Sequence, residues 1–359
     1  MINICISFDY ELFFGKNYYN EEITLFQPTD RILELLDKEQ VKGTFFADVC
    51  SVTQNKKYEK YEYVSCFEQQ VKKAKQNGND IQLHIHPNWL NTSLNGAQWD
   101  FDIDSYRIHT FGFDDGENSA KTIIKNGKTY LEGLLREVDS NYKCIAYRAG
   151  GYSIQPHDEL FAALRENGIL IDSSVCRHVK ATTEANWYNF RRLPNNINWW
   201  IVPNMDFCYM GRADQGGLYE VPLCSKKNNI LEKLIMPADK LVLKNAEPKG
   251  TFIPLYKNAT PLKKVTLIKK IIDYQSSYAL VSFDSMPWQR MVKKLDGLRK
   301  KYNTDNKDIF ISIICHPKLF DDAIRDNMKS FIRFVKENSE NYRFMTFTDV
   351  YDEIQRGGI

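Results

Sequence analysis

Short apolar runs rich in β-branched and aromatic residues alternate with amphipathic helical segments along most of this chain. INICISF (2–8) precedes TDRILELLDKEQ (29–40), whose apolar residues recur at the spacing of one helix face. The series continues with KGTFFAD, DIQLHIH, KCIAYR, ILIDSSV, GLYEVPL, YALVSFD, DIFISIIC and YRFMTF, with helical segments such as PHDELFAALRENG between them. Because parallel strands need long crossovers, usually helices, this alternation predicts a parallel α/β sheet, open or closed into a barrel.

Three segments interrupt the alternation, near residues 88–117, 180–215 and 225–265. We expect one barrel-like domain over residues 1–359 with these segments as long insertions, since no flexible linker or internal repeat divides the chain. The first two segments are rich in aromatic residues. These either pack locally or offer flat faces to sugar rings, and Trp89, Trp199 and Trp200 are the candidates for the second role.

Charge and hydropathy exclude several classes of partner. Lys and Arg total 48 against 46 Asp and Glu, a formal net charge of +2, which gives no electrostatic basis for binding nucleic acid or an anionic membrane. The longest apolar runs, such as IFISIIC, are far shorter than the ~20 residues of a membrane-spanning helix. The start, MINICISF, shows no signal peptide, and the eight cysteines form no CxxC pair. We therefore expect a reduced, cytoplasmic protein; the sequence does not indicate its oligomeric state.

Ionisable residues stand at the carboxyl ends of the predicted strands, where catalytic groups of parallel α/β folds collect. His84 and His86 leave the same face of an extended strand, and so do Asp9 and Glu11, because alternate side chains share a face. The full set is Asp9, Glu11, His84, His86, Arg148, Asp172 and His316. Seven ionisable groups at one rim favour an active site over a structural role.

A second acidic motif, FGFDDG (111–116), has no apolar strand before it. A helix-like segment, ENSAKTIIKNG, follows it directly. We interpret Asp114, Asp115 and Gly116 as a turn and helix start rather than as part of the site.

Five motifs in order, SFDYE, GTFFAD, DIQLHIHP, YRAGGY and IICHP, resemble those of the polysaccharide deacetylase family, the NodB-homology carbohydrate esterases of family 4. Together with the strand that leads into SFDYE, they extend from Ile4 to Pro317, most of the chain. The resemblance implies a distorted (β/α)7-type barrel with long loop insertions. It also implies metal-dependent removal of an N-acetyl group from a sugar.

Two positions depart from the usual family pattern. Tyr10 stands where the family has its second adjacent aspartate, so the D-x-E pair Asp9 and Glu11 would take over. Asn88 stands where the family has its second histidine, so either His86 becomes that ligand or Asn88 coordinates weakly through its amide oxygen. We favour His86, because imidazole is the better ligand for a zinc-like ion.

The resemblance assigns roles to residues of four of these motifs. Glu11, His84 and His86 would hold a divalent metal, most simply zinc, with Asp9 as the base and His316 as the acid that protonates the leaving amine. Arg148 would fix Asp9, although a buried structural ion pair is the alternative, as a polar strand cap is for His316. The backbone of Gly150 and Gly151 would approach the oxyanion, and Tyr152, Trp89 and Asp172 complete the expected substrate-binding residues.

The expected substrate is an intracellular acetylated amino sugar used in surface polysaccharide biosynthesis, either nucleotide-linked, lipid-linked or a small glycoside. This follows from the apparent lack of an export signal. Two other functions stay open: a non-catalytic sugar-binding protein on the same scaffold, and a related amidohydrolase acting on a small C–N substrate.

Overall fold

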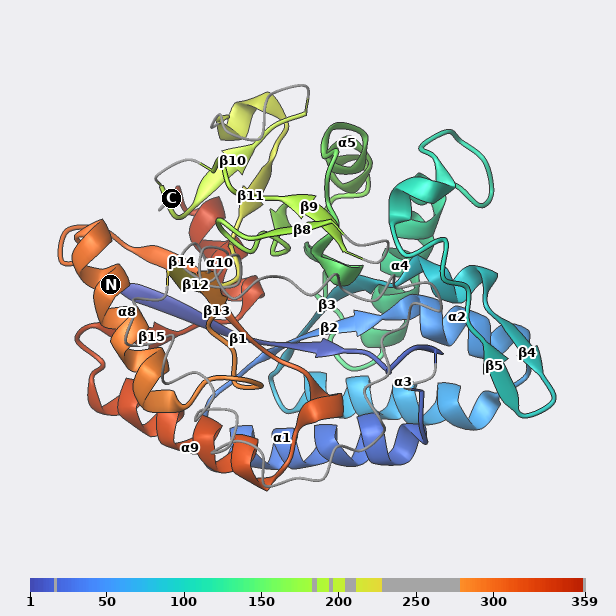
Figure 1. Cartoon of the computed structure of the whole chain (residues 1–359), viewed down its shortest axis with the longest axis horizontal. Coiled ribbons are helices and arrows are strands. Elements are labelled where there is room, and N and C mark those ends of the chain that lie inside the picture. Colours follow the sequence, from blue (N-terminus) through green and yellow to red (C-terminus); the bar gives the residue numbers. More distant parts are fainter. Residues whose placement is uncertain (16–17, 183–185, 194–195, 204–210, 228–277, 358–359) are drawn as a thin grey trace, which may run out of the picture.

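The computed structural model describes residues 1–15, 18–182, 186–193, 196–203, 211–227 and 278–357 (Figure 1). Most of the predicted insertion at 225–265 lies outside these residues. Among the described helices, none combines the length and apolar character needed to cross a bilayer.

A nine-stranded sheet forms the centre of the molecule, in the order β10-β11-β7-β6-β3-β2-β1-β14, with β15 also paired to β1. Only β10 and β11 pair antiparallel; the other neighbours are parallel. This confirms the predicted α/β class. The strands are β1 (Ile2–Tyr10), β2 (Thr44–Asp48), β3 (Asp80–Ile85), β6 (Ala146–Ala149), β7 (Ile171–Asp172), β10 (Trp199–Ile201), β11 (Leu218–Glu220), β14 (Ile309–Cys315) and β15 (Tyr342–Phe344).

The sheet curls until its ends meet. Beyond β11, Leu223 forms parallel bridges with Cys176, just past β7, and with Ser312 in β14. The Leu223 amide donates to the Val175 carbonyl at 2.9 Å, and the Cys224 amide donates to the Ser312 carbonyl at 2.7 Å. The resulting ring of β1, β2, β3, β6, β7, β11 and β14 is the distorted (β/α) barrel that the sequence predicts.

Helices cover the outside of the barrel, and Figure 1 shows α1, α3 and α9 along one side of the central strands. Each buries an apolar stripe, such as Ile32, Leu33 and Leu36 in α1. Side-chain caps fix several starts, as where Ser119 accepts from the Thr122 amide before α4. The helices are α1 (Gln27–Lys38), α2 (Val49–Lys57), α3 (Tyr61–Gln76), α4 (Ala120–Leu135), α5 (Asp158–Glu166), α8 (Trp288–Tyr302), α9 (Asp322–Glu337) and α10 (Phe347–Gln355).

Small hairpins and single helical turns lie outside the main sheet, some of them in the insertions. The hairpins are β4 (Ser93–Asn95) with β5 (Gln98–Asp100), β8 (Lys180–Thr182) with β9 (Trp187–Asn189), and β12 (Ser225–Lys227) with β13 (Tyr278–Leu280). The turns are η2 (Glu22–Phe26), η3 (Pro87–Asn91), η4 (Ile108–Phe111), η5 (Gly150–Tyr152), η6 (Ala213–Gln215) and η7 (Pro317–Leu319).

The barrel interior is layered from apolar to polar. Phe46, Tyr219 and Phe310 belong to an inner apolar cluster separate from the main core, and Phe347 of α10 joins it by packing edge-on against Phe46. The Arg148 guanidinium lies 4.1 Å from the centroid of the Phe46 ring, on top of this cluster. Interior side chains toward the carboxyl ends of the strands are therefore polar.

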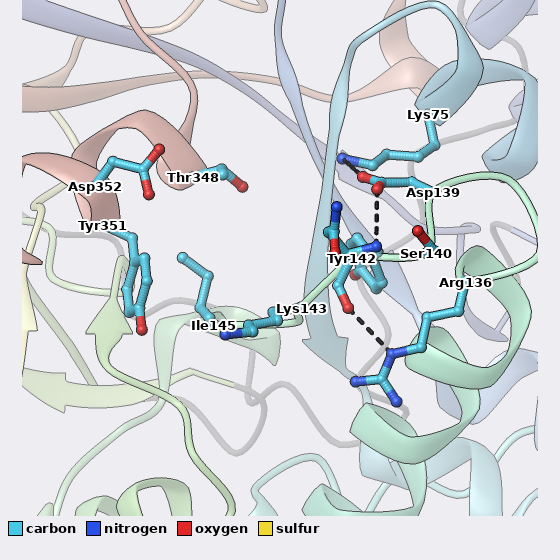
Figure 2. A pocket seen from close by; sticks show the side chains of 11 residues that line it. Lys75, Arg136, Asp139, Ser140, Tyr142, Lys143, Ile145, Thr348, Tyr351 and Asp352 are labelled. Atoms are coloured by element: carbon cyan, nitrogen blue, oxygen red, sulfur yellow. Dashed lines mark hydrogen bonds and ion pairs between the residues drawn. The ribbon is translucent and has the colours of Figure 1, made fainter.

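A pocket of about 450 Å³ opens at the amino-terminal end of the strands (Figure 2). It is lined by Lys75 of α3, by residues between α4 and β6, and by α10. Lys75 is paired with Asp139 at 3.0 Å, and Arg136 Nε donates to the Tyr142 carbonyl at 3.3 Å. This pocket lies at the other end of the barrel from the ionisable residues singled out in the sequence.

Candidate metal centre and acid–base pair

Glu11, His84 and His86 meet inside the carboxyl-terminal mouth of the barrel. Glu11 directly follows β1, while His84 lies in β3 and His86 just beyond it, and all three are buried. Their ligand atoms lie within 4.8 Å of one another. His84 Nε2 is 3.0 Å from Glu11 Oε2, and His86 Nε2 contacts the same oxygen. The structure thus brings together the three residues expected to hold a metal.

The backbone sets the tautomer of His84. Its Nδ1 is 2.8 Å from the Arg148 carbonyl oxygen, which can only accept, so Nδ1 carries the hydrogen. Nε2 then presents its lone pair toward Glu11 when the ring is neutral, the arrangement found in metal-binding histidines. Burial lowers the pKa of His84, but Glu11 and Asp9 outweigh it and raise the pKa to about 9. A metal must therefore displace a proton from His84, and metal binding weakens as pH falls.

His86 is fixed from three sides. Its amide donates to Asp48 Oδ1 at 3.1 Å, and its ring centroid lies 4.6 Å from that of Phe14. On the third side, a Cβ atom at Gly150 would lie 2.8 Å from His86 Nδ1 and 2.6 Å from the Ile85 carbonyl oxygen. Only glycine fits at position 150 without displacing this histidine.

The second oxygen of Glu11 is held by a lysine. Lys318 Nζ donates to Glu11 Oε1 at 2.6 Å, and the Lys318 side chain is only 12% exposed. Burial would raise the pKa of Glu11, but Lys318 and His86 hold it well below its usual range. Glu11 is therefore ionised and available as a metal ligand.

Asp9 forms a buried ion pair with Arg148, whose Nη1 donates to Asp9 Oδ1 at 2.6 Å. Burial would raise the pKa of Asp9, but Arg148, together with His84 and His316, keeps it below its ordinary value. The guanidinium is saturated by further acceptors: the hydroxyls of Ser7, Ser173 and Ser312 and the Ser173 carbonyl, each at 2.9 Å. Arg148 therefore both supports the barrel and holds one oxygen of Asp9.

His316 lies beside Asp9 and Glu11. Its Nε2 is 3.7 Å from Asp9 Oδ2 and 3.7 Å from Glu11 Oε1. Asp284 accepts from the His316 amide at 3.0 Å and lies 2.7 Å from its Nδ1. Burial would lower the pKa of His316, but Asp284 and Asp9 raise it above its ordinary value. This favours the protonated form that a general acid needs.

The expected substrate-binding residues have different surroundings. Gly151 and Tyr152 both adopt positive φ, 57° and 59°, and Tyr152 is only half-buried. Trp89 and Asp172 are fully buried, so neither side chain is exposed to solvent at the mouth of the barrel. Trp89 packs against Phe14 and the aromatic rings of its own insertion, and its burial leaves no free stacking face.

Asp172 instead shapes the end of β7. It accepts hydrogen bonds from the Ser174 amide at 3.0 Å and the Ser174 hydroxyl at 2.8 Å. Glu220 lies directly opposite in the strand register, also fully buried. Trp199 is buried too, and Trp200 packs against Tyr219. Asp172, Glu220 and Trp199 are therefore buried residues of the barrel, and Trp200 packs at the edge of its sheet.

Other sequence predictions fall away from this cluster. Asp114 closes its own turn by accepting from the Gly116 amide at 3.0 Å, and Asp115 is 91% exposed, as expected of a turn before a helix. In the described part of the chain, the two groups of side chains that could hold a metal contain none of the three remaining histidines, His109, His157 and His178. The side-chain amide of Asn88 is fully buried, and no described residue forms a hydrogen bond with it.

Three residues of the site were missed from the sequence: Asp48, Asp284 and Lys318. Asp48 and Asp284 end the apolar runs GTFFAD and YALVSFD, the same signal that singled out Asp9. Lys318 comes two residues after His316 in CHPK, and nothing in that spacing marks it as a partner of Glu11.

Comparison with known proteins gives structural likenesses only. No family model and no curated protein matches the sequence. Among solved structures, a putative polysaccharide deacetylase from Mycobacterium smegmatis is 14% identical with a TM-score of 0.46, over 100% of this chain and 91% of that one. A probable polysaccharide deacetylase from Pseudomonas aeruginosa is 11% identical with a TM-score of 0.48, over 99% and 91%.

A CE4 family pseudoenzyme from Bacillus anthracis also matches, at 10% identity and a TM-score of 0.35, over 97% of this chain and 64% of that one. At such values these likenesses say nothing of activity. The fold and site define an α/β barrel protein with a buried Glu–His–His cluster beside an Asp and His pair. The solved structures it resembles include polysaccharide deacetylases. What the site does follows from its own geometry.

Proposed function

We propose that this protein is a divalent-metal-dependent hydrolase that removes the acetyl group from an N-acetylated amino sugar. The observation that carries the proposal is the position of His316 Nε2, 3.7 Å from both Asp9 Oδ2 and Glu11 Oε1. Asp9 is ionised and the pKa of His316 is raised. Both residues lie beside Glu11, His84 and His86, the side chains that could hold a metal. Amide hydrolysis needs this combination of base and acid.

The residues present fit a metal ion. Glu11, His84 and His86 would hold it, and a carboxylate with two imidazoles is a typical catalytic zinc set. The Nδ1 contact of His84 with the Arg148 carbonyl is the outer support that such ligands usually have. When bound, the ion supplies Lewis acidity for the acetyl carbonyl and makes water more acidic.

The remaining steps belong to the chain itself. Asp9 accepts a proton from the attacking water through Oδ2, because Arg148 occupies Oδ1. The water oxygen bonds to the carbonyl carbon, and the C–N bond breaks. His316 gives its proton to the departing nitrogen, while Asp284 holds the ring in place. The products are acetate and a primary amine.

The sugar assignment draws on aromatic side chains near the mouth of the barrel. Tyr152 follows Arg148 by a short turn and is half-buried, with the Tyr188 ring centroid 6.4 Å away. Trp187 is 44% exposed, with Arg107 over its ring. Partly exposed aromatic rings of this kind suit sugar rings. An acetylated building block of a surface polysaccharide is the substrate we propose.

The test is release of acetate and formation of a primary amine from acetylated amino sugars. Nucleotide-linked, lipid-linked and free glycosides are compared with polymeric chitin and peptidoglycan. We expect release from the small substrates, and at least ~10²-fold less from Asp9→Asn or His316→Ala protein. Release from polymer alone would contradict the substrate class. No release from any acetylated sugar, with metal bound, would indicate a sugar-binding protein instead.

A further inference from the structure

The two oxygens of Glu11 have different partners. Oε2 faces the ring nitrogens of His84 and His86, whereas Oε1 accepts from Lys318 Nζ at 2.6 Å. Lys318 also donates to the Leu12 carbonyl at 3.4 Å, and its ammonium lies 5.2 Å from the Phe13 ring centroid. The ammonium is thus a fixed cation rather than a loose surface charge.

Lys318 contacts a second group of metal-competent atoms. Asp9, Glu11 and His316 also offer ligand atoms within 4.8 Å of one another. Asp284 faces Nδ1 of His316, so a neutral ring would direct the Nε2 lone pair toward both carboxylates. Two carboxylates and an imidazole suit a divalent ion. The Lys318 ammonium on Glu11 Oε1 already supplies positive charge there.

We propose that Lys318 is a positioning residue that restricts Glu11 to one ligand oxygen and excludes a second divalent cation from Asp9, Glu11 and His316. The inference rests on the proposed function for the first ion. It has a chemical consequence: a second ion would occupy the Asp9 oxygen that accepts a proton and the His316 nitrogen that donates one. Lys318 keeps both groups available because its ammonium, which forms no coordinate bond, holds the Glu11 oxygen that the second ion would need.

The test is the zinc content of the whole chain after equilibrium dialysis against Zn²⁺, measured by mass spectrometry. Wild-type protein should hold a single ion, and Lys318→Met should gain a second one. Methionine has a similar length and no charge. Adding His316→Ala to Lys318→Met should return the content to a single ion. Lys121→Met is the matched control, since Lys121 pairs with Asp115 and Glu166 on the surface.

Thermal unfolding checks that each variant is folded, because a misfolded chain binds zinc through exposed cysteine and histidine side chains. Lys318→Gln should show the same gain if the Met variant does not fold. An unchanged content in folded Lys318→Met or Lys318→Gln protein would overturn the inference, and so would loss of the first ion with unaltered thermal unfolding. The two proposals fail differently. Wild-type protein that binds no zinc would contradict the proposed function, whereas one ion in both wild type and variant would contradict this inference alone.

Discussion

Asp284 holds His316 at two points, through the backbone amide at 3.0 Å and through the ring Nδ1 at 2.7 Å. The double contact fixes the ring so that Nε2 faces Asp9 and Glu11. It also opposes the effect of burial on the pKa of His316, which lies above its ordinary value. Asp284 therefore sets both the direction and the protonation of the proposed acid.

Replacing Asp284 should move the alkaline limb of the pH–rate profile. His316 acts protonated, so activity is present below its pKa and is lost as pH rises through it. Asp284→Asn removes the charge that raises this pKa, and the loss of kcat should then begin at lower pH. The measurement is kcat against pH for metal-loaded wild type and variant.

The matched control is Asp158→Asn. Asp158 lies 3.4 Å from His157 Nε2, so it is also an Asp beside a His, but outside the site. Its profile should match wild type. An alkaline limb that stays in place in Asp284→Asn protein would show that His316 is not the acid.

Asp9 and Glu11 should separate into base and ligand. Asp9→Asn should keep the metal and lose hydrolysis by at least ~10²-fold, the usual effect of removing a general base. Glu11→Ala should lose metal and activity together. Metal content and acetate release, measured on the same preparations, distinguish the base from the ligand. Metal loss in Asp9→Asn protein, with metal retained in Glu11→Ala protein, would exchange the two roles.

Gly150→Ala should weaken metal binding although it replaces no ligand. Its Cβ would meet His86 Nδ1 at 2.8 Å and the Ile85 carbonyl at 2.6 Å, so His86 must move. We expect zinc affinity to fall by about 10-fold or more, as when an outer support of a metal ligand is lost. Isothermal titration with Zn²⁺ measures this.

Gly133 provides the control for that substitution. It lies in α4, and a Cβ there meets nothing within 4 Å. Gly133→Ala should keep wild-type zinc affinity and stabilise the fold by roughly 0.5–1 kcal/mol. Equal zinc affinity in both variants would show that Gly150 does not position His86.

The buried pair of Asp172 and Glu220 should make stability depend on pH. Burial, together with the neighbouring Asp172, raises the pKa of Glu220 well above its ordinary value, and burial raises that of Asp172. A carboxyl with a raised folded-state pKa stabilises below its unfolded pKa of about 4.3, and this contribution is lost as pH rises through the folded-state value.

Glu220→Gln removes that titration. The free energy of unfolding of the Glu220→Gln protein minus that of wild type should increase as pH rises from about 4 toward neutrality and above. Urea unfolding of metal-free protein across this range measures the difference. A constant difference between the two proteins would show that Glu220 does not titrate differently in the folded state.

Strand periodicity was sufficient to predict the parallel α/β sheet and the residues of the main cluster, whereas closure into a barrel was expected from the family resemblance. Asp9, Glu11, His84 and His86 lie at strand ends with alternate residues on one face, a local rule that tertiary packing did not alter. Trp89 shows where the sequence was insufficient. Its aromatic character suits either a sugar or a core, and the packing of Phe14 and Phe101 around it decided for the core.

Lys318 could not be predicted for a different reason. Its pairing with Glu11 joins residues 307 positions apart, and a lysine after a strand is ordinarily solvated. The sequence correctly placed Asp172 near the end of a strand, but it did not indicate which neighbour the Asp172 side chain would face. The pairing of β7 with β11 turns it against Glu220, and strand order is a tertiary property.

The most direct test of the account is a zinc titration of acetate release. Protein freed of metal by chelation is given increasing Zn²⁺ and assayed with a small acetylated amino sugar, beside His84→Ala and His86→Ala variants. Hydrolysis should be absent without metal, rise until the zinc bound by Glu11, His84 and His86 reaches a single ion per chain, and stay absent in both variants. Full acetate release by chelated protein, or by variants that bind no zinc, would contradict the account.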